Sequence, residues 1–382
     1  GLIMQLILNE EEQMVRESAQ SFLADNAGPS LLREIRDSNN SLGYSEKLWQ
    51  QMIELGWPSL LIPEQFDGLG FSHVAMGQIM EQAGCHLANS PMFATAVLGV
   101  SILSKEGNEQ QKSQWLPKIA MGNLTLALAL DETARPDPLN IATSVTKSTD
   151  GFILNGNKSM VIDGQIADQL IVVARSSGKP GDRQGISLFV VPRKTAGVEI
   201  TSTLIMDSRI TANISFSGVA LREDQLIGTI DQGMDPLTSA LNVANIHLSA
   251  ELLGIANECL HRTVGYLKDR KQFGVNIGSF QALQHRAASL WSDIELCKST
   301  VMAALRSLDE SAADASLIAS IAKVKACKVA QLATNESIQM HGGIGMTDEF
   351  DIGFFIKRAR IAQMLFGDHR YHLNRYAELS GY

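Results

Sequence analysis

The sequence has 382 residues, of which 45% are hydrophobic and 19% are charged, and its formal net charge at pH 7 is −9. This length and composition are typical of a globular protein with two or three domains and exclude a disordered chain. The acidic balance also argues against a surface that binds nucleic acid or anionic lipid.

Residues 1–122 are predicted to form a helical domain. Asn9 followed by Glu12 is typical of a capping box at a helix start, and apolar side chains then recur on one helical face. The segments SEKLWQQMIELGW and VAMGQIMEQAGCHL show the same spacing. Between them, PSLLIPEQFDGLGF is rich in proline and glycine and is expected to be a loop.

Residues 123–229 are predicted to form a β-domain, a small barrel or sandwich. Its apolar runs are short, for example DQLIVVAR and GISLFVVPR, and turn signals stand between them. We expect turns at Asp150-Gly151, at Asn155-Gly156 and in SSGKPGDRQG.

Residues 230–382 are predicted to form a bundle of four long helices, the last of which ends near Phe366. The expected fold class is therefore α+β and mainly α, in the order helical domain, β-domain, four-helix bundle. The four cysteines form no CxxC pair and the eight histidines form no HExxH pattern, so we expect buried core thiols and no metal site.

No uncharged apolar run reaches the ~18 residues of a membrane helix. The N-terminal stretch GLIMQLILNEEE is short and has no basic flank, so we do not expect a secretion signal. The expected location is the cytoplasm.

Two glycine-bearing motifs could bind a phosphate. In DRKQFGVNIGSFQALQHR, Arg270 ends a helix beside the turn glycines Gly274 and Gly278, and a guanidinium can hold a phosphate through two hydrogen bonds. The alternative is an ordinary helix end with a basic last turn, which the residues alone favour. In QMHGGIGMTDEF, Gly342 and Gly343 would let a phosphate approach the backbone, or would simply end the helix.

Taken together, the two motifs resemble those of the acyl-coenzyme A dehydrogenase family of flavoproteins, and the resemblance extends over the whole chain. It implies the same three-domain fold, an acyl-CoA substrate and FAD. It also implies that FAD is bound across a dimer interface by the residues that we call the diphosphate clamp: Arg270, Gln272, Phe273, Gln339, Gly342 and Gly343.

The flavin-ring side departs from the family pattern. The family's TEPxAGSD run is LDETARPDP here, with Asp131 at the threonine position and Asp137 at the serine position. A strand that would offer a threonine hydroxyl to the flavin reads Met160-Val161-Ile162, and Ile162 has none. Asp131 is expected to disfavour an anionic reduced flavin.

The catalytic base is also missing. The resemblance places the family's usual glutamate at Phe366, and the alternative base position, on the helix before RKQFG, at Ala244. Glu251 fits a helix-packing pattern and is not expected to replace it. Asp368, two residues after Phe366, could have become the base, although a helix cap or a pair with Arg370 is the preferred interpretation. The catalytic residue in this chain is therefore unknown.

This set of departures resembles the small subunits of two-subunit dehydrogenases, such as the pimeloyl-CoA dehydrogenase small subunit and steroid side-chain dehydrogenase subunits. The resemblance implies a complex with a catalytic subunit that converts an acyl-CoA to a trans-2-enoyl-CoA, with an electron-transferring flavoprotein as acceptor. Two alternatives stay open: a self-sufficient homo-oligomer that uses Asp368, and a non-catalytic acyl-CoA-binding or scaffold protein.

Overall fold

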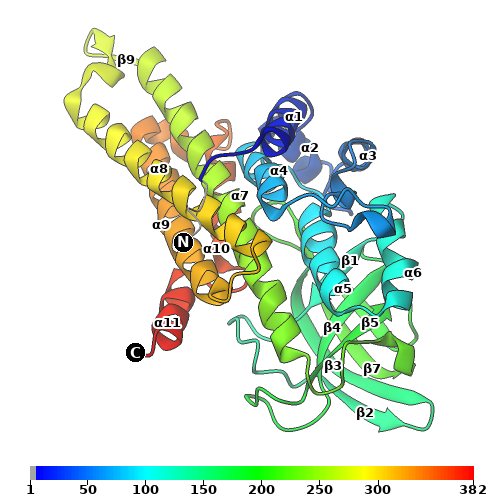
Figure 1. The fold of residues 1–382 in the computed structure, drawn as a ribbon. Helices are drawn as coiled ribbons and strands as arrows, with labels where there is room; N and C mark the ends of the chain where they lie inside the picture. Colours follow the sequence, from blue (N-terminus) through cyan, green and yellow to red (C-terminus); the bar gives the residue numbers. More distant parts are fainter. Residues whose placement is uncertain (1–5) are drawn as a thin grey trace. The chain divides into compact units, whose positions relative to one another are not determined.

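The computed structural model describes residues 6–382, and Figure 1 shows their elements. The first five residues of the GLIMQLILNEEE stretch lie outside the described part. The chain divides into two compact units. We call them the helical unit (residues 6–34, 72–88 and 245–382) and the sheet unit (residues 35–71 and 89–244).

The helical unit contains the predicted long helices. Its elements are α1 (Glu10–Asn26), α4 (His73–Cys85), the larger part of α7 (Met234–Asp269), β9 (Lys271–Gln272), β10 (Val275–Asn276), the 3₁₀-helix Ile277–Ser279, α8 (Gln281–Asp309), α9 (Ala315–His341), the 3₁₀-helix η6 (Gly342–Met346), α10 (Ile352–Met364) and α11 (His369–Leu379). The helix α2 (Pro29–Asp37) crosses the boundary between the units. The four long helices are confirmed as α7 to α10, while α11 had no separate prediction.

The start of α1 has the predicted capping box. The Asn9 side chain accepts a hydrogen bond from the Glu12 amide (2.8 Å), and the Glu12 carboxylate accepts one from the Asn9 amide (2.9 Å). Glu12 is buried and also pairs with Arg306 of α8 (Nη2–Oε2 2.7 Å). The capping box therefore fixes both the first turn of α1 and its attachment to the bundle.

The sheet unit is built around one mixed sheet with the strand order β6-β7-β3-β2-β4-β5-β8, to which β1 adds by parallel pairing with β4. The strands are β1 (Leu126–Ala129), β2 (Ser144–Ser148), β3 (Gly151–Ile162), β4 (Gln169–Arg175), β5 (Ile186–Pro192), β6 (Val198–Leu204), β7 (Ile210–Leu221) and β8 (Leu226–Ile227). The helices are α3 (Glu46–Glu54), three short 3₁₀-helices (Trp57–Ser59, Glu64–Phe66 and Glu223–Gln225), a π-helix (Met92–Gly99), α5 (Val100–Glu106) and α6 (Glu109–Ala120). One face of the sheet packs a core of Val, Leu, Phe and Ala side chains.

One turn prediction in this unit is wrong. Asn155-Gly156 lies inside β3, where the pairing with β7 shifts register between Leu154 and Gly156. A Cβ at Gly156 would lie 2.4 Å from Thr143 Oγ1, and its φ is +144°. The glycine therefore marks a β-bulge with close backbone approach, which the sequence signal does not distinguish from a turn. The strands β6 and β8 were not predicted.

The α+β, mainly α fold is confirmed. The boundaries at 122/123 and 229/230 stay predictions, because the two compact units share the N-terminal helices instead of following the chain order.

Candidate functional site

The first clamp motif forms a small hairpin at the end of α7. The strands β9 and β10 pair across a turn in which Phe273 and Gly274 have φ of +54° and +77°. The hairpin is attached to the helix because the Ile277 amide donates to the Arg270 carbonyl (2.9 Å). The sequence folds this way because glycine adopts the left-handed conformation readily.

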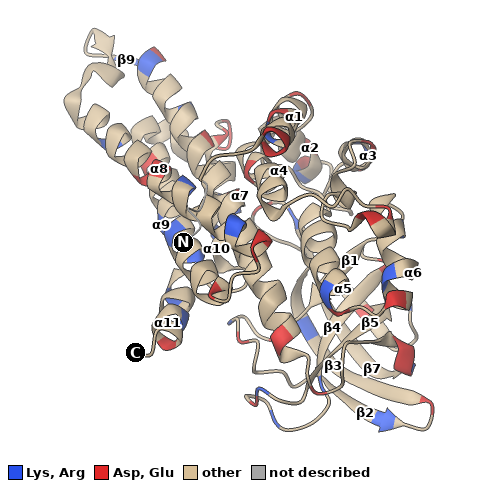
Figure 2. Ribbon diagram, viewed as in Figure 1, with Lys and Arg blue, Asp and Glu red and all other residues tan. Residues whose placement is uncertain are grey.

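The side chains of this hairpin face outward. Phe273 is 90% exposed, and Arg270 and Gln272 are exposed as well. Figure 2 shows basic residues where α7 meets β9. Within residues 6–382, the Arg270 guanidinium has no hydrogen-bond or ion-pair partner, and Phe273 contacts one other ring, Phe280, edge-on (6.2 Å between centroids). A bare aromatic ring beside an unpaired guanidinium is typical of a surface that a ligand or another chain covers.

The second clamp motif follows the end of α9. Gly342 has a φ of +68° and ends the helix, and Gln339, Gly342 and Gly343 are exposed. A Cβ at either glycine would meet nothing within 4 Å. The glycines are therefore not required by packing inside this chain, and they leave an open backbone edge that a ligand can approach closely.

The structure brings the two motifs together through aromatic rings. Tyr266, one turn before Arg270, stacks on His341, which immediately precedes Gly342 (4.4 Å between centroids). Phe350 contacts both rings, at 6.0 Å from Tyr266 and 5.2 Å from His341. Sequence reasoning did not identify this link, because contacts between rings 75 positions apart leave no local pattern.

The donor set of the clamp fits a diphosphate. Arg270 offers a planar guanidinium, Gln272 and Gln339 offer amides, and the two glycines offer backbone that a phosphate can reach. These residues would hold FAD by its diphosphate. Nothing in this group resembles a flavin-ring site, which the resemblance places on the β-domain.

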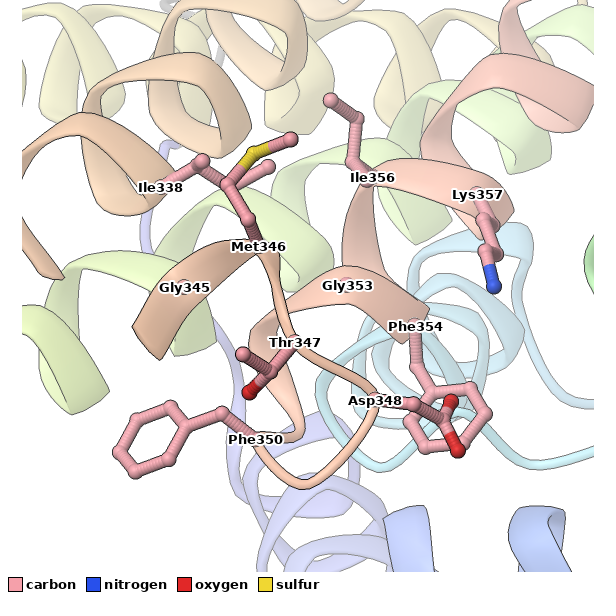
Figure 3. A pocket seen from close by; sticks show the side chains of 10 residues that line it. All are labelled: Ile338, Gly345, Met346, Thr347, Asp348, Phe350, Gly353, Phe354, Ile356 and Lys357. Atoms are coloured by element: carbon pink, nitrogen blue, oxygen red, sulfur yellow. The ribbon is translucent and has the colours of Figure 1, made fainter. Parts of the chain in front are cut away.

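A pocket of about 260 Å³ lies beside the second motif, between η6 and α10 (Figure 3). Its wall is mostly apolar and includes Ile338, Met346 and Phe354, with Lys357 and Asp348 at its edge. The Asp348 carboxylate pairs with Arg33 (3.0 Å). This paired carboxylate is the only one among the residues that line the pocket.

On the sheet unit, Asp131 follows β1, and its carbonyl accepts a hydrogen bond from the Ser159 amide of β3 (2.7 Å). Desolvation raises the pKa of the Asp131 carboxyl to about 6, and the positive charge of Lys158 opposes that rise. Lys158 itself is buried and pairs with Glu132 (2.7 Å). Burial therefore works against the charged form of Asp131, and among residues 6–382 the nearest cation, Lys158, pairs with Glu132 instead.

The neighbouring positions also differ from a hydroxyl-bearing flavin bed. Asp137 is exposed and its carboxylate accepts from the Leu139 amide (3.2 Å), as in an ordinary Asx turn. Ile162 is buried and apolar. Ser159, which sequence reasoning missed, has a buried hydroxyl without a hydrogen-bond partner in the described chain. The available sequence signal for Ser159 was its position directly before Met160-Val161-Ile162, the segment compared with the family's flavin-contacting strand.

Phe366 lies in the turn between α10 and α11 and has a φ of +55°. The Lys323 ammonium, from the third turn of α9, donates to the carbonyls of Leu365 (2.6 Å) and Gly367 (3.0 Å). The Phe366 carbonyl accepts from His372 Nε2 (3.0 Å) and, at 3.3 Å, from an asparagine of α7. The turn therefore has a fixed backbone, but the side chain that it carries is not an acid.

Asp368 caps α11. Its Oδ1 accepts from the backbone amides of Arg370 (3.1 Å) and Tyr371 (2.9 Å). The preferred interpretation of this residue as a helix cap is confirmed.

The other two positions considered for a base offer no free carboxylate in the described chain. Ala244 is fully buried. Glu251 is buried and pairs with Arg358 of α10, with Nη1 and Oε1 3.5 Å apart. Its role in packing is confirmed, as a buried ion pair between two helices.

The four cysteines are buried free thiols, as predicted. In the described part of the chain, no group of three or more His, Cys, Asp or Glu could hold a metal ion. No helix in residues 6–382 has the length and apolar character needed to cross a membrane.

Three family models match successive parts of the chain: acyl-CoA dehydrogenase N-terminal domain (residues 9–123), middle domain (residues 127–219) and C-terminal domain (residues 231–380).

Two similar proteins are an isovaleryl-CoA dehydrogenase of Arabidopsis thaliana and a short/branched chain specific acyl-CoA dehydrogenase of Bos taurus. The Arabidopsis protein is 28% identical over 94% of this chain and 88% of its own length. The Bos taurus protein is 27% identical over 97% of this chain and 85% of its own length. Among solved structures, butyryl-CoA dehydrogenase from Megasphaera elsdenii superimposes with a TM-score of 0.91 at 25% identity, over 99% of this chain and 100% of that one. A variant of the Tcur3481-Tcur3483 steroid ACAD superimposes with a TM-score of 0.87 at 27% identity. That match covers 97% of this chain and 98% of the other chain.

Proposed function

This chain belongs to the acyl-CoA dehydrogenase family of FAD-dependent oxidoreductases, and from that membership we propose that it is the FAD-clamping subunit of a heteromeric enzyme. The complex would convert an acyl-CoA to the trans-2-enoyl-CoA. A catalytic family subunit would supply the base. This chain would supply the diphosphate clamp.

The proposal rests mainly on one observation, which is that a phenylalanine, Phe366, occupies the position where the resemblance places the catalytic glutamate. Its turn is held by buried side chains at three consecutive carbonyls, so no neighbouring carboxylate can take its place by a small backbone shift. The nearest acid along the chain, Asp368, is engaged by two amides at the start of α11. A positioned base typically contributes ~10²–10⁴-fold to proton abstraction, and this chain has none there.

The exposed clamp supports the other half of the proposal. Within residues 6–382, Phe273 is 90% exposed and contacts only the Phe280 ring, and the Arg270 guanidinium beside it is exposed and unpaired. A diphosphate bound with a neighbouring subunit would satisfy the guanidinium and cover the ring. FAD, when bound, supplies the two-electron acceptor of the family's reaction.

Asp131 argues against a flavin ring seated on this chain's own sheet unit. Its carboxylate is ionised above a pKa of about 6, and a negative charge near the ring would disfavour an anionic reduced flavin. Ile162 offers no hydroxyl in compensation. The paired name Tcur3481-Tcur3483 among the similar structures is in keeping with a two-component arrangement.

The proposed partners are an acyl-CoA substrate, a catalytic acyl-CoA dehydrogenase subunit in a dimer or tetramer, and an electron-transferring flavoprotein as acceptor. The cytoplasm stays the expected location. A self-sufficient enzyme using Asp368 has no support in the geometry, since that carboxylate caps a helix.

The test is the visible absorbance spectrum of the chain purified alone, followed by an assay of acyl-CoA oxidation with an artificial electron acceptor. We expect much less than one flavin per chain and no turnover with any acyl-CoA. A full flavin complement together with robust turnover would contradict the proposal.

A further inference from the structure

The Lys323 ammonium is a buried cation whose hydrogen bonds go to the turn that carries residue 366. Lys323 is fully buried in α9. Its three N–H groups match three oxygens: the carbonyls of Leu365 (2.6 Å) and Gly367 (3.0 Å) and the Asn245 side chain (3.0 Å). An ammonium has three donors and no acceptor, so this site fits its charged form without an unpaired group.

The remaining carbonyl of the turn, that of Phe366, is bound by His372 and by the Asn245 side chain amide. The Phe366 carbonyl accepts from His372 Nε2 (3.0 Å), and His372 Nδ1 lies 3.1 Å from Ser320 Oγ. Arg375 donates to the same hydroxyl (3.0 Å). Since Nε2 must be the protonated nitrogen to donate to a carbonyl, His372 is the neutral tautomer that accepts from Ser320.

Gly367 is confined as well. A Cβ there would lie 2.2 Å from the Tyr371 ring, and its φ is +104°. Phe366 itself has a φ of +55°, a conformation that a bulky side chain rarely adopts without external support. The buried contacts of Lys323 and His372 are that support.

We propose that Lys323 is the positioning residue of the α10–α11 turn: its charged ammonium fixes the backbone of residues 365–367 and so fixes the direction of the side chain at position 366. In this chain the turn therefore presents Phe366 as a rigid apolar surface. The inference does not depend on the proposed function, because it concerns the turn alone.

The charge state of Lys323 makes the proposal testable by pH. Burial lowers the pKa of this ammonium to about 8, and the nearby acidic groups Cys327, Asp368 and Glu251 oppose that shift. A neutral amine keeps only two N–H donors, so one of the three oxygens would lose its partner. The charged or titratable groups around the site come from every helix packed there: Cys327 of α9, Glu251 of α7 with its partner Arg358 of α10, and Asp368, His372 and Arg375 of the turn and α11.

The experiment places a nitroxide label on Phe366→Cys and reads its mobility by electron paramagnetic resonance. The four native thiols are buried, so labelling is selective. With Lys323 present we expect an immobilised label, and with Lys323→Met a mobile one. Lys328→Met removes an exposed lysine of the same helix and should leave the spectrum unchanged.

The pH series supplies a readout that a merely structural residue would not change. The mobile fraction should rise with a midpoint near pH 8 in the Lys323 background and in Lys328→Met. In Lys323→Arg, which stays charged, the spectrum should not change over this pH range. The pH series in the unsubstituted Lys323 background decides the question even if Lys323→Met fails to fold.

Hydrogen exchange with the native Phe366 in place controls for effects of the label. In Lys323→Met, amides of a 364–372 peptide should exchange at least about tenfold faster, the loss expected from even one of the three hydrogen bonds of the ammonium, while those of β5 should not change. A label equally immobilised in Lys323→Met, or a pH-independent spectrum in the Lys323 background, would overturn the proposal.

Discussion

The Tyr266 ring stacks on the His341 imidazole, with their centroids 4.4 Å apart and their planes 27° from parallel. Tyr266 is one turn before Arg270, and His341 immediately precedes Gly342, so this contact ties the two halves of the diphosphate clamp together. His341 is itself held by a hydrogen bond between Nδ1 and the Ser337 carbonyl (2.6 Å).

Replacing Tyr266 by alanine should weaken FAD binding without removing any group that touches the cofactor. An aromatic pair contributes about 0.5–1.5 kcal/mol beyond its buried area, so we expect a twofold to tenfold rise in the dissociation constant of FAD from the complex. Tyr266→Phe keeps the ring and should bind FAD normally. Equal FAD affinity in the wild type and Tyr266→Ala would show that the stack does not organise the clamp.

Arg270→Ala should release FAD from the complex that holds it. A charge-assisted contact to a diphosphate contributes ~1.5–3 kcal/mol, which corresponds to about a tenfold to hundredfold loss of affinity. Arg270→Lys should recover only part of that loss, since an ammonium lacks the planar fork. Fluorescence titration of FAD measures both. An unchanged affinity in Arg270→Ala would mean that the clamp residues are assigned wrongly.

The sequence predicts features that depend on neighbouring residues, and it does not predict contacts between distant positions. The helix spacing, the Asn9–Glu12 cap and the two glycine-bearing motifs are local patterns, and the first two are confirmed by the structure. The Tyr266–His341 stack and the bonds from Lys323 to residues 365–367 join positions 42 to 75 apart, and a lone lysine or tyrosine in a helix gives no signal for them. The prediction of a turn at Asn155-Gly156 was wrong because a β-bulge and a turn use the same residue types, and the local sequence does not distinguish them.

Phe366→Glu should not create an active enzyme from the chain alone. The turn would hold the new carboxylate in place, but a base supplies only part of the rate, and the rest comes from orienting the thioester and stabilising developing charge. The resemblance places Asp131 and Ile162 of the sheet unit where the family has hydroxyl groups. Assays with several acyl-CoAs should therefore find no turnover, and measurable turnover would show that loss of the base was the only defect.

The free energy of unfolding should fall in acid partly because of His372. Burial, helped by the charge of Lys323, lowers the pKa of this imidazole to about 3. The native state then keeps His372 neutral while the unfolded chain takes up a proton below about pH 6.5, so stability is lost as the pH falls from about 6.5 toward 3.

The variant His372→Gln isolates this contribution, because its amide can still donate to the Phe366 carbonyl and accept from Ser320. Over this range we expect its slope of unfolding free energy against pH to be shallower by up to about 1.4 kcal/mol per pH unit, as measured by chemical denaturation. Parallel curves for the two proteins would show that the pKa of His372 is the same in the native and unfolded states.

The chain should not function as a monomer. Phe273 is 90% exposed, and Trp291 and Leu296 of α8 are 57% and 61% exposed, which is costly for a surface that stays in water. Light scattering at working concentration should therefore find a dimer or larger assembly, alone or with the catalytic subunit. A monodisperse monomer that still holds FAD would be incompatible with a clamp that acts on a neighbouring chain.

The most direct test of the central claim is the rate of acyl-CoA oxidation by this chain alone and after addition of a catalytic family subunit. We predict no turnover alone, and turnover in the complex that is lost in Arg270→Ala but retained in Phe366→Ala. Robust oxidation by the wild-type chain alone, abolished by Asp368→Asn, would contradict the account and identify Asp368 as the base.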